Sequence, residues 1–79
     1  MNKLTGLIPE SICKLKNIDC IDLSFNHLEG HIPLSIGKLS RLRYLFLECN
    51  SLQGKIPEPI KYLTSLRTFN VNGNNNLEY

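Results

Sequence analysis

The sequence lacks tryptophan, long apolar runs and any strong excess of charge, and each absence excludes a class of protein. No run of about 18 apolar residues occurs, so we expect no part of the chain to insert directly into a membrane. The net charge of +2 is too small for a nucleic-acid-binding surface, which needs a stripe of basic residues. The apolar share of 42% is ordinary for a folded domain. Seventy-nine residues allow one domain with a small core.

Residues that carry chemistry are also sparse. The three cysteines and two histidines include no Cys-x-x-Cys pair and no Cys/His spacing typical of a metal site. The sequence contains no phosphate loop, no nucleophile motif and no pair of carboxylates expected to converge. We therefore expect no catalytic residue, no metal ion, no cofactor and no enzymatic activity.

What the sequence does contain is a repeat. Shifted by 24 residues, the chain aligns with itself, and seven columns are apolar in every copy. Asparagine, glycine and proline recur at the same interval, as Asn2, Asn26, Asn50 and Asn74, as Gly6, Gly30 and Gly54, and as Pro9, Pro33 and Pro57. A fixed period of this length predicts a solenoid of stacked laps. We place the laps at 2–25, 26–49 and 50–73, with a degenerate tail at 74–79, in a single domain spanning 1–79.

Each lap is predicted to change direction several times. The segment Leu42-x-x-Leu45-x-Leu47 alternates buried and exposed positions, as in a short strand, and strands one lap apart can only stack in parallel. Pro33 suits the first turn of a short helix, where its missing N–H costs little. Asn50 is predicted to turn inward and satisfy backbone groups that the bend frees, so the recurring asparagines form a structural ladder.

The last lap departs from this pattern. Asn76 stands where the repeat expects leucine, and Leu77 follows one place late. The end of the chain is therefore either frayed or shifted by a one-residue insertion.

The repeat resembles the plant-type leucine-rich repeats of receptor-like kinases, receptor-like proteins and polygalacturonase-inhibiting proteins. The stretches "LTGLIPESICKL" and "LEGHIPLSIGKL" follow that family's Leu-Ser/Thr-Gly-x-Ile-Pro pattern, although Glu29 and Gln53 replace the hydroxyl residue kept as Thr5. The resemblance implies an α/β solenoid. It would be a right-handed leucine-rich-repeat coil with short parallel strands on the concave face and short 3-10-like helical turns on the convex face.

In such a coil the exposed strand residues line the concave face, where exposed aromatic rings beside arginines and acids are typical of protein recognition. The candidate partner-binding residues are Asp19, Asp22, Phe25, Arg43, Tyr44, Phe46, Glu48, Arg67 and Asn70. We expect them to bind a protein or peptide ligand. Alternatively they are ordinary solvated residues, with Asp19 and Arg43 forming a surface ion pair of little weight.

Cysteine placement predicts free thiols. Cys20 and Cys49 are expected on adjacent strands but about five residues apart along them, roughly 16 Å, which no disulfide spans. The predicted ends of the coil carry no polar cap, so end-to-end self-association of the 79-residue chain is expected.

By resemblance, the parent protein would lie in the plasma membrane, with the repeats on the extracellular side of a longer receptor in signalling or defence. One alternative is an inhibitor-type repeat protein that binds a secreted cell-wall enzyme. Another is a stand-alone intracellular adaptor, which would be cytoplasmic if the chain is complete as written.

Overall fold

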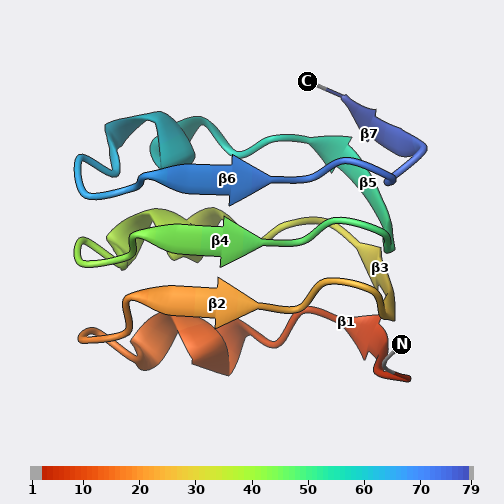
Figure 1. Cartoon of the computed structure of the whole chain (residues 1–79), viewed down its shortest axis with the longest axis horizontal. Coiled ribbons are helices and arrows are strands. Elements are labelled where there is room, and N and C mark those ends of the chain that lie inside the picture. Colours follow the sequence, from red (N-terminus) through yellow and green to blue (C-terminus); the bar gives the residue numbers. More distant parts are fainter. Residues whose placement is uncertain (1–2, 79) are drawn as a thin grey trace.

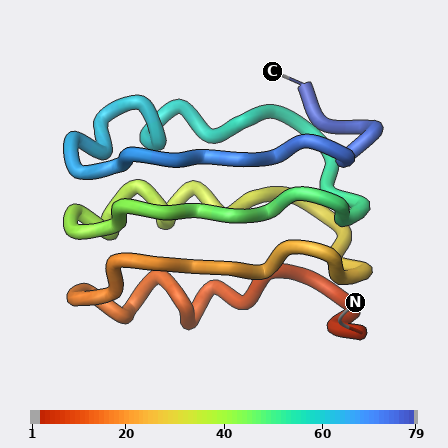
Figure 2. The backbone as a smooth tube through the Cα atoms, viewed as in Figure 1, coloured from red at the N-terminus to blue at the C-terminus, as the bar shows by residue number. Residues whose placement is uncertain are grey.

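The computed structural model describes residues 3–78 and shows three stacked laps and the first strand of a fourth (Figure 1). The strands are β1 (Thr5–Leu7), β2 (Cys20–Asp22), β3 (His27–Gly30), β4 (Tyr44–Phe46), β5 (Ser51–Lys55), β6 (Thr68–Asn70) and β7 (Asn76–Glu78). The 3-10 helices are η1 (Glu10–Lys14), η2 (Leu34–Lys38) and η3 (Glu58–Tyr62). Figure 2 traces how each lap passes through a helix, a strand and a bend before the next lap begins above it.

The strands β2, β4 and β6 form one parallel sheet, with the helices behind it (Figure 1). Cys20 pairs with Tyr44, and Tyr44 with Thr68, so the sheet register is the 24-residue shift of the sequence. Each lap donates to the carbonyls of the lap before it: the N–H groups of Arg43 and Arg67 bond Asp19 O and Arg43 O, both at 2.8 Å. The predicted parallel stack is confirmed.

A second parallel sheet, in the order β1-β3-β5-β7, covers one flank of the stack, where the sequence predicted only turns and bends. Gly6, Gly30 and Gly54 lie in it with φ values of +83°, +79° and +84°, which L-residues rarely adopt. Glycines that adopt positive φ usually mark turns, and for this reason the strands of this second sheet were not predicted. The available signal was the alternation around Leu28, which is buried between the exposed His27 and Glu29.

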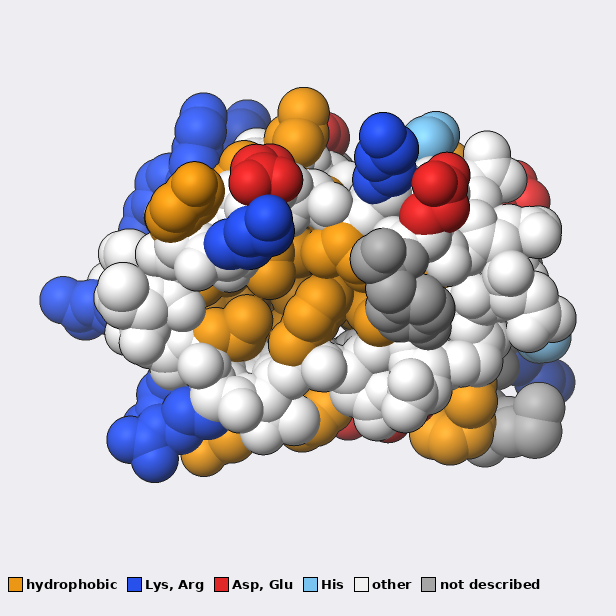
Figure 3. Space-filling model, turned by 90° about the horizontal axis from the view of Figure 1, so that it is seen from above, with side chains coloured by type: hydrophobic (Ala, Val, Ile, Leu, Met, Phe, Trp, Pro, Cys, Tyr) orange, Lys and Arg blue, Asp and Glu red, His pale blue; other side chains and the backbone are white. Residues whose placement is uncertain are grey.

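The core lies between the two sheets and the helices. Each helix starts after a proline, as at Pro33 with φ −63°, and closes with the i→i+3 bond from Ile36 N–H to Pro33 O at 3.2 Å. Fully buried leucines of the middle laps fill the interior: Leu39, Leu42, Leu45, Leu47 and Leu52. The top view in Figure 3 shows apolar side chains gathered in the middle of the last lap's open end, where Ile56, Ile60 and Phe69 line a hollow.

The predicted degenerate tail contains a paired strand. β7 adds to β5, with Gln53 opposite Asn76 and Gly54 opposite Leu77, an offset of 23 residues. In the pairing of β1 with β3 the offset is 22, as between Thr5 and His27. The one-residue difference matches the insertion reading and contradicts the frayed one. Leu77 is buried as a result.

All three cysteines are free. Cys13 is buried in η1, and Cys20 is exposed on β2. Cys49 was predicted to lie on a strand, but it lies in the bend after β4, with φ +59°. Within residues 3–78 no helix is long and apolar enough to cross a membrane.

Candidate partner-binding face

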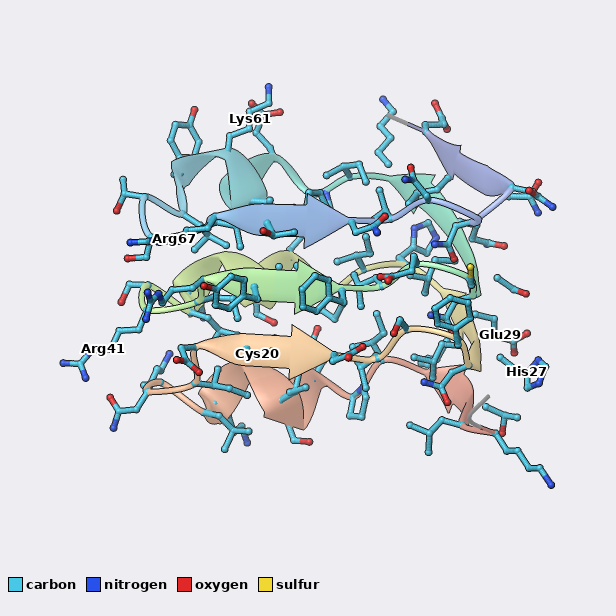
Figure 4. The ribbon with its side chains drawn as sticks, viewed as in Figure 1. Cys20, His27, Glu29, Arg41, Lys61 and Arg67 are labelled. Carbon is cyan, nitrogen blue, oxygen red and sulfur yellow. The ribbon has the colours of Figure 1, made fainter. Side chains whose placement is uncertain are left out.

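We call the outward-facing residues of β2, β4 and β6, with those just before each strand and in the bend after it, the strand face. Figure 4 looks directly onto it, with Cys20 on β2, the lowest of the three strands in this view, and Arg41 and Arg67 near the strand starts. The structure places all nine predicted partner-binding residues here: Asp19, Asp22, Phe25, Arg43, Tyr44, Phe46, Glu48, Arg67 and Asn70. Parallel pairing in register brings them together from three laps.

An aromatic pair occupies the middle of the strand face. Tyr44 and Phe46 are two residues apart on β4, so their side chains share one side of the sheet. Their rings stack with centroids 6.3 Å apart and planes 12° apart. The guanidinium carbon of Arg43 lies 5.8 Å from the Tyr44 ring centroid, a cation–π contact. Both rings are half-buried, which leaves apolar surface for a ligand.

The predicted ion pair between Asp19 and Arg43 is wrong. These residues are joined through their backbones, while the Arg43 guanidinium lies over Tyr44 instead. Among residues 3–78 the one ion pair joins Lys61 to Glu58 at 3.1 Å, on the exposed surface of η3. The charged groups of Asp19, Arg43 and Arg67 therefore stay outside ion pairs at the start of the strands.

The strand ends carry acceptors. Asp22 Oδ1 accepts from the Ser24 hydroxyl at 2.6 Å and from the Ser24 N–H at 3.1 Å. These two hydrogen bonds, the hydroxyl first, hold the pKa of Asp22 below its ordinary value. Asn70 Oδ1 accepts from Asn72 N–H at 3.0 Å in the same way. The middle lap has Phe46 in this column, so its bend lacks such a side-chain acceptor.

The bend after each strand needs a left-handed residue. Phe25 and Cys49 meet this requirement with φ values of +55° and +59°, and Gly73 does so in the third lap with +78°. For residues other than glycine this conformation is unfavourable. The Phe25 N–H donates to Glu48 O at 2.9 Å, which holds the bend, and the Phe25 side chain stays 49% exposed. A large exposed ring in a strained position is typical of a binding residue.

Buried asparagines fix these bends from inside. Asn50 Oδ1 accepts from Leu28 N–H at 3.0 Å, and Asn50 Nδ2 donates to Leu23 O at 2.9 Å. Asn74 repeats both bonds one lap later, to Leu52 N–H at 3.0 Å and Leu47 O at 2.9 Å. Asn26 Oδ1 accepts from Leu4 N–H at 3.0 Å. The fourth predicted member of the ladder, Asn2, lies outside the described residues.

The sequence reasoning missed an apolar groove on the flank. Residues of the Gly-x-Ile-Pro motifs line it, and Leu7 and Leu34 at its sides are each 67% exposed. His31 packs over Gly54, where a Cβ atom would overlap its ring, so this histidine is a packing residue of the flank. No group of three or more potential metal ligands gathers among residues 3–78.

The chain matches the family model described as Leucine Rich Repeat over residues 17–39 and 41–63. It is similar to the plant peptide hormone receptor RGFR1, solved in complex with RGF2, with 45% identity and a TM-score of 0.95 over 98% of this chain and 12% of that one. It is similar to a chain of the BIR3–SERK2 complex from Arabidopsis thaliana, with 39% identity and a TM-score of 0.93 over 99% of this chain and 42% of that one.

A third similar structure is the leucine-rich-repeat ectodomain of the plant membrane receptor kinase GASSHO1/SCHENGEN3 from Arabidopsis thaliana. Its sequence is 36% identical to this chain and the TM-score is 0.85, over 89% of this chain and 8% of that one. The chain thus spans less than half the length of each of these relatives. No curated protein sequence matches the chain.

Proposed function

The chain belongs to the leucine-rich-repeat family, in the plant receptor-ectodomain type, and from that premise we propose that its strand face binds a peptide or protein segment. The observation that carries the proposal is the stacked pair of Tyr44 and Phe46, flanked by arginines and carboxylates that form no ion pair. Aromatic rings and arginine dominate binding energy at protein interfaces. The complexes of RGFR1 with RGF2 and of PEPR1 with AtPEP1 support this reading by analogy.

The cellular setting follows from the same relatives. They are receptor ectodomains, and we propose that this chain is likewise an extracellular segment of a longer plasma-membrane receptor that takes part in signalling or defence. The role of the segment itself is recognition, without catalysis. An inhibitor of a secreted enzyme would use the same face, so the partner's identity distinguishes the two roles.

The test is a matched pair of tyrosine substitutions. A phage-displayed library of random 12-residue peptides is selected against the 79-residue chain, and the affinity of one recovered peptide is measured by calorimetry. Tyr44→Ser removes half of the aromatic pair, whereas Tyr62→Ser alters a tyrosine that is 73% exposed on the helical side. We expect at least a ~10-fold loss of affinity for Tyr44→Ser and no change for Tyr62→Ser. Equal affinities for the two variants would place binding elsewhere.

A further inference from the structure

The apolar groove on the flank of the stack is a second surface that a partner can reach. Two columns of side chains form its walls: Leu7, His31 and Lys55 on one side, and Glu10, Leu34 and Glu58 on the other. We propose that this flank groove binds an extended segment of a partner protein in which leucine-like side chains recur beside lysine or arginine. The inference goes beyond the proposed function, because no residue that lines the flank groove belongs to the strand face.

The flank groove crosses all three laps. Its volume is about 860 Å³, and its lining comes from the flank strands, the starts of the 3-10 helices and the Gly-x-Ile-Pro segments between them. Ile8, Ile32 and Pro33 on its floor are buried. A shallow groove that passes from lap to lap over an apolar floor suits an extended chain that lies across the laps.

Leu34 shows that the apolar wall does not result from the open ends of the stack. It lies in the middle lap, where Ile36 of the same helix η2 is 1% exposed, yet the Leu34 side chain is 67% exposed. Leu7 on β1 is equally exposed on the other wall. Exposed apolar side chains that join into one surface mark an interaction site, because covering them removes apolar area from water.

Carboxylates give the flank groove a charge opposite to that of the whole chain. Glu10, Glu58 and Glu78 line it together with one lysine, Lys55, whereas the formal net charge of the chain is +2. Among residues 3–78 the one ion pair joins Glu58 to Lys61, and since both side chains are more than two-thirds exposed it gains little free energy. Charge complementarity therefore favours a basic occupant.

The next lap holds Glu10 in place at the groove. Its Oε2 accepts from the Ser35 hydroxyl at 2.6 Å, and Ser35 directly follows Leu34 on η2. A hydroxyl group orients the carboxylate but leaves its negative charge uncompensated, and a carboxylate has further lone pairs to accept with. A lysine or arginine that enters beside Leu34 can therefore pair with a carboxylate that is already positioned.

Other classes of partner fit the flank groove less well. An anionic lipid surface or a nucleic acid would bring negative charge against its carboxylates. The sequence has no Asn-x-Ser/Thr site, so no N-linked glycan on this chain covers the groove. Lysine and arginine pack their methylene stems on apolar walls while their charged ends reach a carboxylate, so a basic segment matches both features of the groove.

The test uses a short synthetic peptide that repeats Leu-Lys-Pro. In the polyproline II conformation, which has three residues per turn, such a peptide carries its leucines along one face and its lysines along another. The peptide is titrated into the isotope-labelled 79-residue chain, and NMR follows the backbone amide signals. We expect the signals of Leu7, Glu10 and Leu34 to shift, while those of Tyr44 and Phe46 do not. Counterparts that repeat Leu-Glu-Pro or Ser-Lys-Pro should bind at least ~10-fold more weakly.

Two matched pairs of variants separate the groove from the rest of the surface. Leu34→Ser removes an apolar wall, whereas Tyr62→Ser alters a residue that is 73% exposed on η3 outside the groove. Glu10→Gln removes a charge and keeps an acceptor for Ser35, whereas Glu29→Gln neutralises an exposed carboxylate on β3 that does not line the groove. Leu34→Ser should weaken the Leu-Lys-Pro peptide ~10-fold and Glu10→Gln ~3-fold, while both controls change nothing. Thermal unfolding should show all four variants folded.

The amide signals and the counterpeptides decide the outcome. Shifts confined to the strand face, or equal binding of the three peptides, would overturn the flank groove as a binding site and leave the proposed function standing. Groove signals that shift when the chain alone is concentrated would assign the groove to a second copy and contradict the inference as well. If the strand face fails its own test while the peptide still shifts Leu34, the flank groove stands without it.

Discussion

The main-chain N–H of Phe25 donates to the carbonyl of Glu48 at 2.9 Å and joins the bends of the first two laps. This bond explains how a bulky residue keeps φ at +55°. The strained backbone is held from the next lap, and the ring is presented at the end of the strand face. The cost of the strain is on the order of 1 kcal/mol.

Substitution of Phe25 should show how much backbone strain at this position costs in stability. Phe25→Gly relieves the left-handed strain, as Gly73 does in the third lap, but loosens the unfolded chain, so we expect unfolding free energy to change by less than about 1 kcal/mol. Phe25→Val places a β-branched side chain at positive φ and should cost about 1–2 kcal/mol. Urea unfolding measures both. A Phe25→Gly variant that is the less stable of the two would show that backbone strain does not govern this position.

The ladder asparagine Asn50 should be far more sensitive than a surface asparagine. Its buried side chain makes bonds to Leu28 N–H and Leu23 O, so Asn50→Leu leaves buried backbone groups without partners. We expect a loss of more than about 2 kcal/mol in urea unfolding. Asn17→Leu, in an exposed turn, is the control and should be nearly neutral. A loss below about 0.5 kcal/mol for Asn50→Leu would mean that its bonds contribute little.

Much of this fold can be predicted from the sequence, because aligning the repeats with one another shows which residues of neighbouring laps pair. The 24-residue shift fixes which residues pair in β2, β4 and β6, and the asparagine column marks the inward bends. The flank sheet was not predicted, because Gly30 with positive φ looks locally like a turn, and only pairing with the neighbouring laps makes its segment a strand. Sequence shows which residues form a lap; it does not show every edge along which laps pair.

For the strand face, the sequence identified the column positions but not the contacts. The alternative reading paired the Arg43 guanidinium with the Asp19 carboxylate, but this guanidinium lies over Tyr44 instead. A surface ion pair gains little free energy, and the ring of the next residue offers a cation–π contact. The buried Oε1 of Glu48, which has no hydrogen-bond partner among the described residues, could not be predicted either. Burial of a single atom depends on side-chain packing across laps, which a column alignment leaves open.

Asp22 should make a small, assignable contribution to stability against acid. Its pKa in the folded chain lies below the ordinary 3.8, mainly because the Ser24 hydroxyl bonds the ionised form. A depressed folded pKa stabilises the fold above pH 3.8, and that stability is lost as the pH falls through the lower folded pKa. Asp22→Asn keeps the acceptor oxygen, as Asn70 does, but does not titrate. Denaturant unfolding between pH 7 and pH 2 should show a smaller acid loss for the variant; superimposable losses would exclude the Asp22 contribution.

The ends of the stack differ sharply from its middle. Leu15 and Leu39 occupy the same column one lap apart, yet Leu15 is 53% exposed and Leu39 is 0% exposed. The other end also shows apolar side chains (Figure 3), although β7 covers part of it by pairing with β5. Apolar end faces favour contact with another copy. The 79-residue chain is therefore expected to self-associate with rising concentration.

β7 should limit that association. It occupies the edge of β5 that β1 of a stacking copy would otherwise pair with, and Leu77 fills the buried position there. Removing residues 75–79 should therefore strengthen association, since it opens both the β5 edge and the core beside it. Sedimentation equilibrium checks this: the mass should rise above that of the monomer, which is 9.0 kDa for the full chain, at lower concentration for the shortened chain than for the full one. Leu15→Lys in the shortened chain should restore the monomer by charging the opposite end face. A shortened chain that stays folded and monomeric would show that the open edge and end faces do not drive assembly.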